Sequence, residues 1–223
     1  MGANLDLSLT ASRDPQAGLR AARRETMLEV VQVGSGVALV AFMWTHVMLV
    51  SSVLLGASTM DRIAHLMEVT WGAYLVPPAV TVLFLAHAVL AARKIPFRLD
   101  ERLAGIERTA AFRHHDSLTW WIQVVTGMTI FALGLTHIWV VVTTYPILAA
   151  KSAVRVHGPY LWFYIPLLIG VELHASVGLY RAMIKWGWVP REAMRRAEIL
   201  MTAFFLALGS VTLAALWKLG GPG

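Results

Sequence analysis

Cysteine is absent from this 223-residue sequence, and charged residues are scarce. Without cysteine the chain can form no disulfide, thiolate zinc site or iron–sulfur cluster, and it cannot attach haem through a Cys-x-x-Cys-His motif. Only 14% of the residues are charged, against about a quarter in a typical soluble domain. Together with a hydrophobic content of 57%, this scarcity places the chain among membrane proteins.

The sequence also shows no secretory signal and no internal repeat. The first 29 residues are polar and contain no short apolar core followed by a cleavage site, so we expect no signal peptide. Five later stretches are long enough to cross a bilayer, which needs about 20 residues. They are 30–55, 72–92, 118–145, 159–180 and 198–217. The sequence therefore predicts an all-α integral membrane bundle of five transmembrane helices. Residues 1–223 form one domain in this prediction, with 1–29 as an N-terminal arm.

Lysine and arginine are distributed unevenly among the connectors. If the N-terminus is cytoplasmic, all but four of the 19 basic residues lie on the cytoplasmic side. The exceptions are Arg62, Lys151, Arg155 and Lys218. Because short cytoplasmic connectors are enriched in lysine and arginine, we expect a multi-pass protein with a cytoplasmic N-terminus. The net charge of +6 then reflects topology, and nucleic acid is not an expected partner.

Four of the eight histidines lie within the apolar stretches, one in each of the first four: His46, His87, His137 and His174. An ionisable group at membrane depth is costly and usually marks a functional site. Counting residues to the helix ends puts His46 and His137 near the outer side, and His87 and His174 near the inner side. At 1.5 Å per residue the two levels should be roughly 15 Å apart.

Two histidines on facing helices at one depth can ligate a haem iron from both sides. This leaves no iron position open for oxygen and favours electron transfer. One buried histidine could instead form a simple interhelical hydrogen bond. A histidine-based metal or proton transporter is a second alternative, although its ligands would gather at one depth near the midplane. Two separate levels favour two haems.

The sequence around these histidines resembles one protein family. The matching stretches are FMWTHVMLVSSVLLG, FLAHAVLAARKIPF, HHDSLTWWIQVVTGMTIFALGLTH and VELHASVGLYRAMIKWGW. They resemble the dihaem cytochrome b subunit of quinol:fumarate reductases within the succinate:quinone oxidoreductase family. The resemblance covers about residues 30 to 218.

The resemblance implies a membrane subunit of a menaquinol:fumarate reductase in the inner (cytoplasmic) membrane of a bacterium. Such a subunit oxidises menaquinol in anaerobic respiration. It passes electrons through two haems b to an iron–sulfur subunit and an FAD-containing flavoprotein, which holds the dicarboxylate site. The resemblance does not decide whether the complex is dimeric. An alternative is that the same complex works as a succinate:menaquinone reductase.

The resemblance also implies roles for individual residues. His46 and His137 match the ligands of the outer haem iron, and His87 and His174 match those of the inner one. Haem propionates are matched by Gln32, Trp120 and Lys185 at the inner haem and by Arg155 at the outer haem. Glu68 matches a quinol proton acceptor, and Glu172 matches a buried carboxylate that transfers protons.

Each of these polar residues also has a simpler interpretation. Lys185 and Arg155 could be interfacial cations whose stems lie along the bundle while their charges reach water. Glu68 could be a solvated carboxylate at a helix end. Glu172 could be a protonated carboxyl group that bonds to a neighbouring helix.

Overall fold

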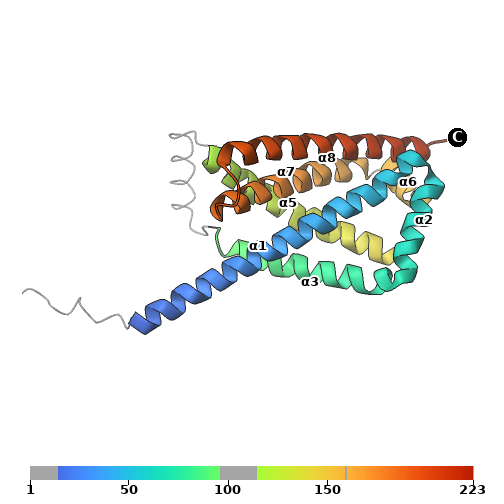
Figure 1. The fold of residues 1–223 in the computed structure, drawn as a ribbon. Coiled ribbons are helices and arrows are strands. Elements are labelled where there is room, and N and C mark those ends of the chain that lie inside the picture. The colour runs from blue at the N-terminus through green and yellow to red at the C-terminus, as the bar shows by residue number, and fades with distance from the viewer. Residues whose placement is uncertain (1–14, 96–114, 159, 223) are drawn as a thin grey trace, which may run out of the picture.

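The computed structural model of the chain describes residues 15–95, 115–158 and 160–222, and the regular elements in these ranges are helical (Figure 1). They are α1 (Pro15–Ser51), the 3₁₀ turn η2 (Ser52–Leu55), α2 (Ala57–Met67), the π-helical turn η3 (Glu68–Gly72), α3 (Ala73–Ala92), α5 (His115–Thr143), α6 (Ala149–His157), α7 (Leu161–Lys185) and α8 (Arg191–Leu219). Several basic residues of the predicted cytoplasmic side lie outside the described residues, namely Arg13, Arg98, Arg102, Arg108 and Arg113.

Five of these helices are long and apolar enough to cross a membrane: α1 together with η2, α3, α5, α7 and α8. The prediction of an all-α membrane bundle with five spans is thus confirmed. The helices nevertheless run past the apolar stretches. Helix α1 begins at Pro15, α7 continues to Lys185, and α8 begins at Arg191. The reason is that Arg, Glu, Lys and Ala favour helix, so loss of apolarity marks the end of a span and not the end of a helix.

The bundle is organised around α7, which packs against α5 on one side and α8 on the other. Helix α1 lies along α3 and crosses the bundle obliquely, and its first turns project beyond the other helices (Figure 1). We call the end where α3 and α7 end and α8 begins the basic end. The opposite end, which holds α2 and α6, is called the α6 end.

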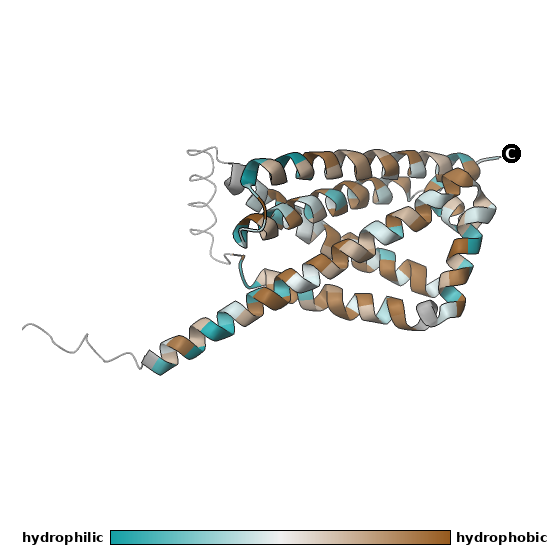
Figure 2. Cartoon of the chain, viewed as in Figure 1, coloured by the Kyte–Doolittle hydropathy of each residue, from teal (hydrophilic) through white to brown (hydrophobic). Residues whose placement is uncertain are grey.

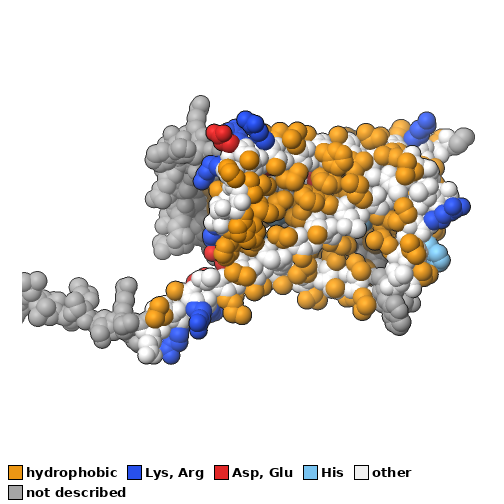
Figure 3. All heavy atoms as spheres, viewed as in Figure 1, with side chains coloured by type: hydrophobic (Ala, Val, Ile, Leu, Met, Phe, Trp, Pro, Cys, Tyr) orange, Lys and Arg blue, Asp and Glu red, His pale blue; other side chains and the backbone are white. Residues whose placement is uncertain are grey.

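The outer surface of the bundle is apolar over most of its length. Large side chains such as Trp139, Val82 and Leu200 are about two-thirds exposed or more. Figure 2 shows the apolar residues in the middle of the spans, and Figure 3 shows a hydrophobic face with Lys and Arg towards its two ends. A surface of this kind would promote aggregation in water, whereas the hydrocarbon of a bilayer solvates it.

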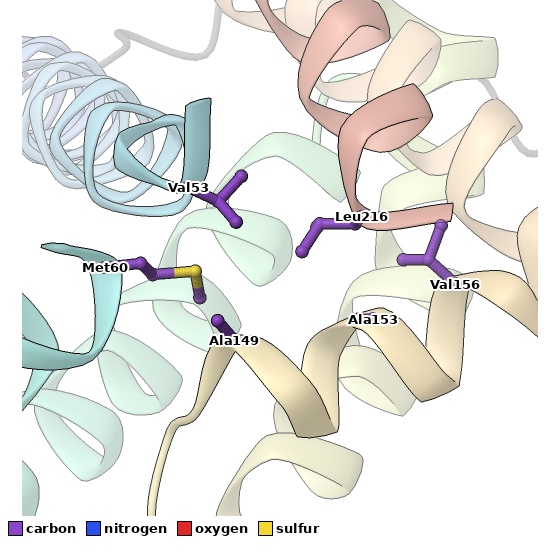
Figure 4. Packing of buried hydrophobic residues seen from close by; sticks show 6 residues of the cluster. All are labelled: Val53, Met60, Ala149, Ala153, Val156 and Leu216. Carbon is purple, nitrogen blue, oxygen red and sulfur yellow. The ribbon is translucent and has the colours of Figure 1, made fainter. Parts of the chain in front are cut away.

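Short helices cover the α6 end, where only connectors between spans were expected from the sequence. One buried cluster joins these short helices to α8 (Figure 4). It consists of Val53 of η2, Met60 of α2, Leu216 of α8, and Ala149, Ala153 and Val156 of α6. This cluster ties the short helices η2, α2 and α6 to the end of α8. The connectors therefore form a fixed cover over this end of the bundle.

Two carboxylates hold the start of α6. Asp61 Oδ1 accepts a hydrogen bond from the Ala149 backbone nitrogen at 2.7 Å. Glu68 Oε1 accepts one from the Ile147 nitrogen at 2.9 Å. Negative charge is favourable at a helix N-terminus, where the backbone N–H groups lack partners. Glu68 is thereby fixed between η3 and α6.

Candidate functional site

A continuous cavity of about 2280 Å³ runs through the bundle. It is lined mainly by apolar side chains of α1, α3, α5 and α7, and His46, His87, His137 and His174 all border it. A pocket for one small ligand usually measures about 300–1,000 Å³. The cavity therefore has room for two large ligands.

The structure brings the rings of His46 and His137 together across α1 and α5. Their centroids are 5.9 Å apart and their planes are inclined by 65°. Within the described part of the chain, Nδ1 of His137 is buried and has no hydrogen-bond partner. This pair lies towards the α6 end.

His87 of α3 and His174 of α7 form the other pair, with centroids 6.4 Å apart and planes inclined by 87°. Nδ1 of His87 lies 3.1 Å from Ser35 Oγ and 3.1 Å from the Gln32 carbonyl oxygen. Nδ1 of His174 lies 3.2 Å from Thr126 Oγ1.

Both separations fit two axial ligands on one metal ion. An imidazole nitrogen binds a metal at about 2.0 Å and the ring centre lies roughly 1.2 Å further away, so two opposed rings should have centroids about 6.3 Å apart. Among the described residues no group of three or more His, Cys, Asp or Glu gathers at either pair. Two imidazoles at this separation, without further side-chain ligands, suit a metal whose other positions are filled by a planar macrocycle.

Two glycines let helices approach the rings of the His87–His174 pair. A Cβ on Gly36 of α1 would lie 2.9 Å from Cε1 of His87, and a Cβ on Gly127 of α5 would lie 3.0 Å from Cε1 of His174. Any side chain at these positions would displace the rings. The depth pairing derived from the sequence and the pairs in the structure are the same, while haem ligation by these histidines stays a prediction.

The residues predicted to hold propionates at the His87–His174 pair also border the cavity: Gln32, Trp120 and Lys185. Lys185 pairs with the carboxylate of Glu29, which also accepts a hydrogen bond from Lys94 Nζ at 2.9 Å. Gln32 Oε1 is buried without a partner among the described residues. The basic end of the cavity is therefore bordered by a cation and by an amide oxygen without a partner among the described residues.

Arg155 lies in the last turn of α6 and also borders the cavity. Its Nε donates to the Lys151 carbonyl at 3.1 Å, and its guanidinium also interacts with Tyr164. The Tyr164 ring lies 5.9 Å from that of His137, centroid to centroid. Arg155 therefore stands beside the His46–His137 pair. Tyr164 could not be recognised from the sequence, because one tyrosine in an apolar stretch carries no distinguishing signal.

Glu68 borders the cavity at the α6 end. Its side chain is half-buried, and Oε1 accepts a hydrogen bond from the Ile147 amide. It begins the π-helical turn η3, and such turns are frequent at functional sites.

Glu172 is completely buried in α7, and neither carboxylate oxygen has a hydrogen-bond partner in the described structure. The helical wheel puts it about 200° from His174, yet it borders the same cavity. A buried carboxyl group without a partner is costly. The described residues provide no interhelical hydrogen bond that would explain its presence.

These features define a multi-pass membrane protein with two internal pairs of histidines. The profile of the family described as succinate dehydrogenase/fumarate reductase transmembrane subunit matches residues 104–216. The fumarate reductase cytochrome b subunit of Wolinella succinogenes is 34% identical over 89% of this chain and 84% of its own length. That of Helicobacter pylori is 33% identical over 91% of this chain and 85% of its own length.

The chain therefore belongs to the family of succinate dehydrogenase and fumarate reductase transmembrane subunits, as the sequence resemblance indicated. It is a membrane subunit of an oxidoreductase complex.

Proposed function

We propose that this chain is the dihaem cytochrome b subunit of a menaquinol:fumarate reductase. In this proposal it takes electrons from menaquinol and delivers them towards an iron–sulfur subunit and a FAD-containing flavoprotein. The observation that carries the proposal is the presence of two imidazole pairs, with centroids 5.9 and 6.4 Å apart, around one cavity. The name of the relatives, fumarate reductase cytochrome b subunit, agrees with it.

Each pair offers two imidazoles, so His46 with His137 would hold one haem b and His87 with His174 would hold the other. When bound, the two haems supply one-electron transfer and leave no iron position open for oxygen. The protein contributes the fixed separation of the rings, and Gly36 adds the close approach of a neighbouring helix.

The charged and polar residues beside each pair suit the two propionate groups that every haem carries. At the basic end these are Lys185, Trp120 and Gln32. A propionate would compete with Glu29 for the Lys185 ammonium group. At the α6 end Arg155, steadied by its bond to the Lys151 carbonyl, is the matching cation.

Quinol oxidation releases protons as electrons leave, so it needs a base near the first electron acceptor. Glu68 is the carboxylate at the α6 end of the cavity, the same end as the His46–His137 pair. The Ile147 amide holds Oε1, which orients the group and makes Oε2 the oxygen that accepts the quinol proton. General-base catalysis of this kind contributes about 10²–10⁴-fold.

Glu172 suits proton transfer through the bundle. Electrons that pass from the α6 end to the basic end carry negative charge across much of the membrane. A proton moving in the same direction cancels that charge movement. A buried carboxyl group that is not committed to a hydrogen bond can take up and release such a proton.

The distribution of basic residues supports a basic end in the bacterial cytoplasm, with the protein in the inner membrane and its N-terminus inside. The iron–sulfur subunit would then dock on the connectors at this end. One of them is 181–197, and the other is 93–117, of which residues 96–114 lie outside the described structure. We treat residues 1–223 as one domain.

An optical spectrum of the purified complex tests the proposal. We expect a reduced-minus-oxidised haem b signal and two haems for each copy of this chain. A chain that lacks haem and carries zinc instead would support the transporter alternative. Turnover of a menaquinol analogue with fumarate, compared with succinate oxidation by the same complex, determines the physiological direction.

A further inference from the structure

The hydrogen bonds around the His87–His174 pair fix which ring nitrogens carry protons. Ser35 Oγ lies 2.9 Å from the Gln32 carbonyl oxygen, to which it donates its only proton. His87 Nδ1 approaches both Ser35 Oγ and that carbonyl at 3.1 Å. A carbonyl oxygen can only accept, so Nδ1 of His87 must carry the proton and Nε2 must be bare.

Nδ1 of His174 also carries the proton. Thr126 Oγ1 lies 2.6 Å from the Ile122 carbonyl oxygen and donates its proton there. It must therefore accept from Nδ1 of His174 at 3.2 Å. The Gln123 amide nitrogen lies 3.2 Å from Nε2 of His174, and an amide N–H can donate only to a nitrogen without a proton. Both contacts of His174 thus agree with a proton on Nδ1, the tautomer that the Gln32 carbonyl selects for His87.

The two hydroxyls belong to a pattern that occurs in both α1 and α5. Ser35 is followed by Gly36 and, eleven residues after Ser35, by His46; Thr126 is followed by Gly127 and, eleven residues after Thr126, by His137. Eleven residues make about three full helical turns and rise about 16 Å. The hydroxyl and the histidine therefore share one helix face at two different levels.

Each of these helices consequently serves both pairs. It contributes its own histidine to the His46–His137 pair, and one level away it offers a hydroxyl and a glycine to a ring of the His87–His174 pair. The glycine admits Cε1 of that ring, and the adjacent hydroxyl binds Nδ1. By contrast, Nδ1 of His137 has no partner among the described residues.

We propose that Ser35 and Thr126 are positioning residues, which hold His87 and His174 in the Nδ1-protonated tautomer so that both present a bare Nε2 to one iron. This inference rests on the proposed haem-binding function. Nε2 of His174, to which the Gln123 amide donates in this structure, is the nitrogen that would bind the iron. Partners of this kind orient a metal-bound imidazole and make it a stronger ligand.

Thr126→Val tests the proposal most sharply, because Ser35→Ala leaves the Gln32 carbonyl as an acceptor for His87. Loss of the hydrogen bond makes His174 less electron-rich, which favours ferrous over ferric iron. We expect the redox equilibrium of this haem to shift by up to about tenfold, or about 59 mV for one electron. Haem retention against an apoprotein acceptor should fall roughly 10- to 100-fold.

Conservative and matched variants separate positioning from folding. Thr126→Ser keeps the hydroxyl and should restore the potential, while Ser35→Ala should give a smaller shift of the same sign. Thr129→Val, which loses only a hydroxyl bonded to its own helix at Val125, should change nothing. The potential of the other haem should stay constant, with the two signals assigned by His174→Ala and His46→Ala.

The outcomes distinguish this inference from the function on which it rests. A wild-type complex without haem overturns both. Two haems in the wild type with an unshifted potential in Thr126→Val overturns the positioning role alone, and so does an equal shift in Thr129→Val.

Discussion

Replacement of Glu172 should separate stability from turnover, because its carboxyl group is fully buried and has no partner within the described structure. An unsatisfied buried polar group costs about 1–3 kcal/mol. Glu172→Leu removes that group and should raise the free energy of unfolding by about 1–3 kcal/mol. Membrane-insertion free energies give the same sign of change. At membrane depth an acidic residue is unfavourable by a few kcal/mol, whereas leucine is favourable by about 0.5 kcal/mol.

The effect on turnover should have the opposite sign. Moving one charge across the membrane costs about 2.3 kcal/mol for every 100 mV, so two electrons moving against the potential meet about 4.6 kcal/mol per 100 mV. Without a compensating proton, this cost opposes each turnover. Glu172→Gln should therefore keep both haems and lose most quinol-driven fumarate reduction, whereas Glu172→Asp should keep part of it.

Proteoliposomes with a menaquinol analogue provide the assay, with charge movement recorded alongside fumarate reduction and thermal unfolding measured in detergent. Glu25→Gln is the control, because Glu25 is an exposed acidic residue of α1 and lies outside both proposed docking connectors. Full activity and unchanged charge movement in Glu172→Gln would refute the proton-transfer role. A less stable Glu172→Leu variant would show instead that the carboxyl group forms a stabilising bond.

Further variants test the other parts of the site. His87→Ala should remove one haem and His46→Ala the other in the optical spectrum, and retention of both haems in either variant would contradict the pairing. Glu68→Gln should lower quinol turnover about 10²–10⁴-fold with both haems retained and with succinate oxidation by an artificial acceptor unchanged; normal quinol turnover would move the base elsewhere. Lys185→Met should lower the potential of the haem at the basic end, because a nearby cation favours the reduced, less positive iron. Lys151→Met, at the other end of the bundle, should leave that potential unaltered.

The amino-acid sequence alone determined the five spans and the two histidine pairs. The spans follow from the bilayer, which requires about 20 apolar residues from every helix that crosses it. The pairs follow from the constant rise of a helix, which converts the distance of a histidine from the helix end into a depth. His46 and His137, like His87 and His174, could therefore be matched without knowledge of packing. The roles of Glu68, Glu172, Lys185 and Arg155 came from family resemblance and remain predictions.

Only the tertiary structure revealed what surrounds the histidines. Serine and threonine in a helix usually bond to their own backbone, so the sequence gives no sign that Ser35 and Thr126 also reach rings on other helices. The short helices α2 and α6 were missed because each is too short to cross a bilayer, and their apolar residues become buried only where Met60 meets Ala149. Depth along one helix is a local property, whereas contact across helices depends on how each helix is rotated about its axis, and that rotation is set by the packing of the whole bundle.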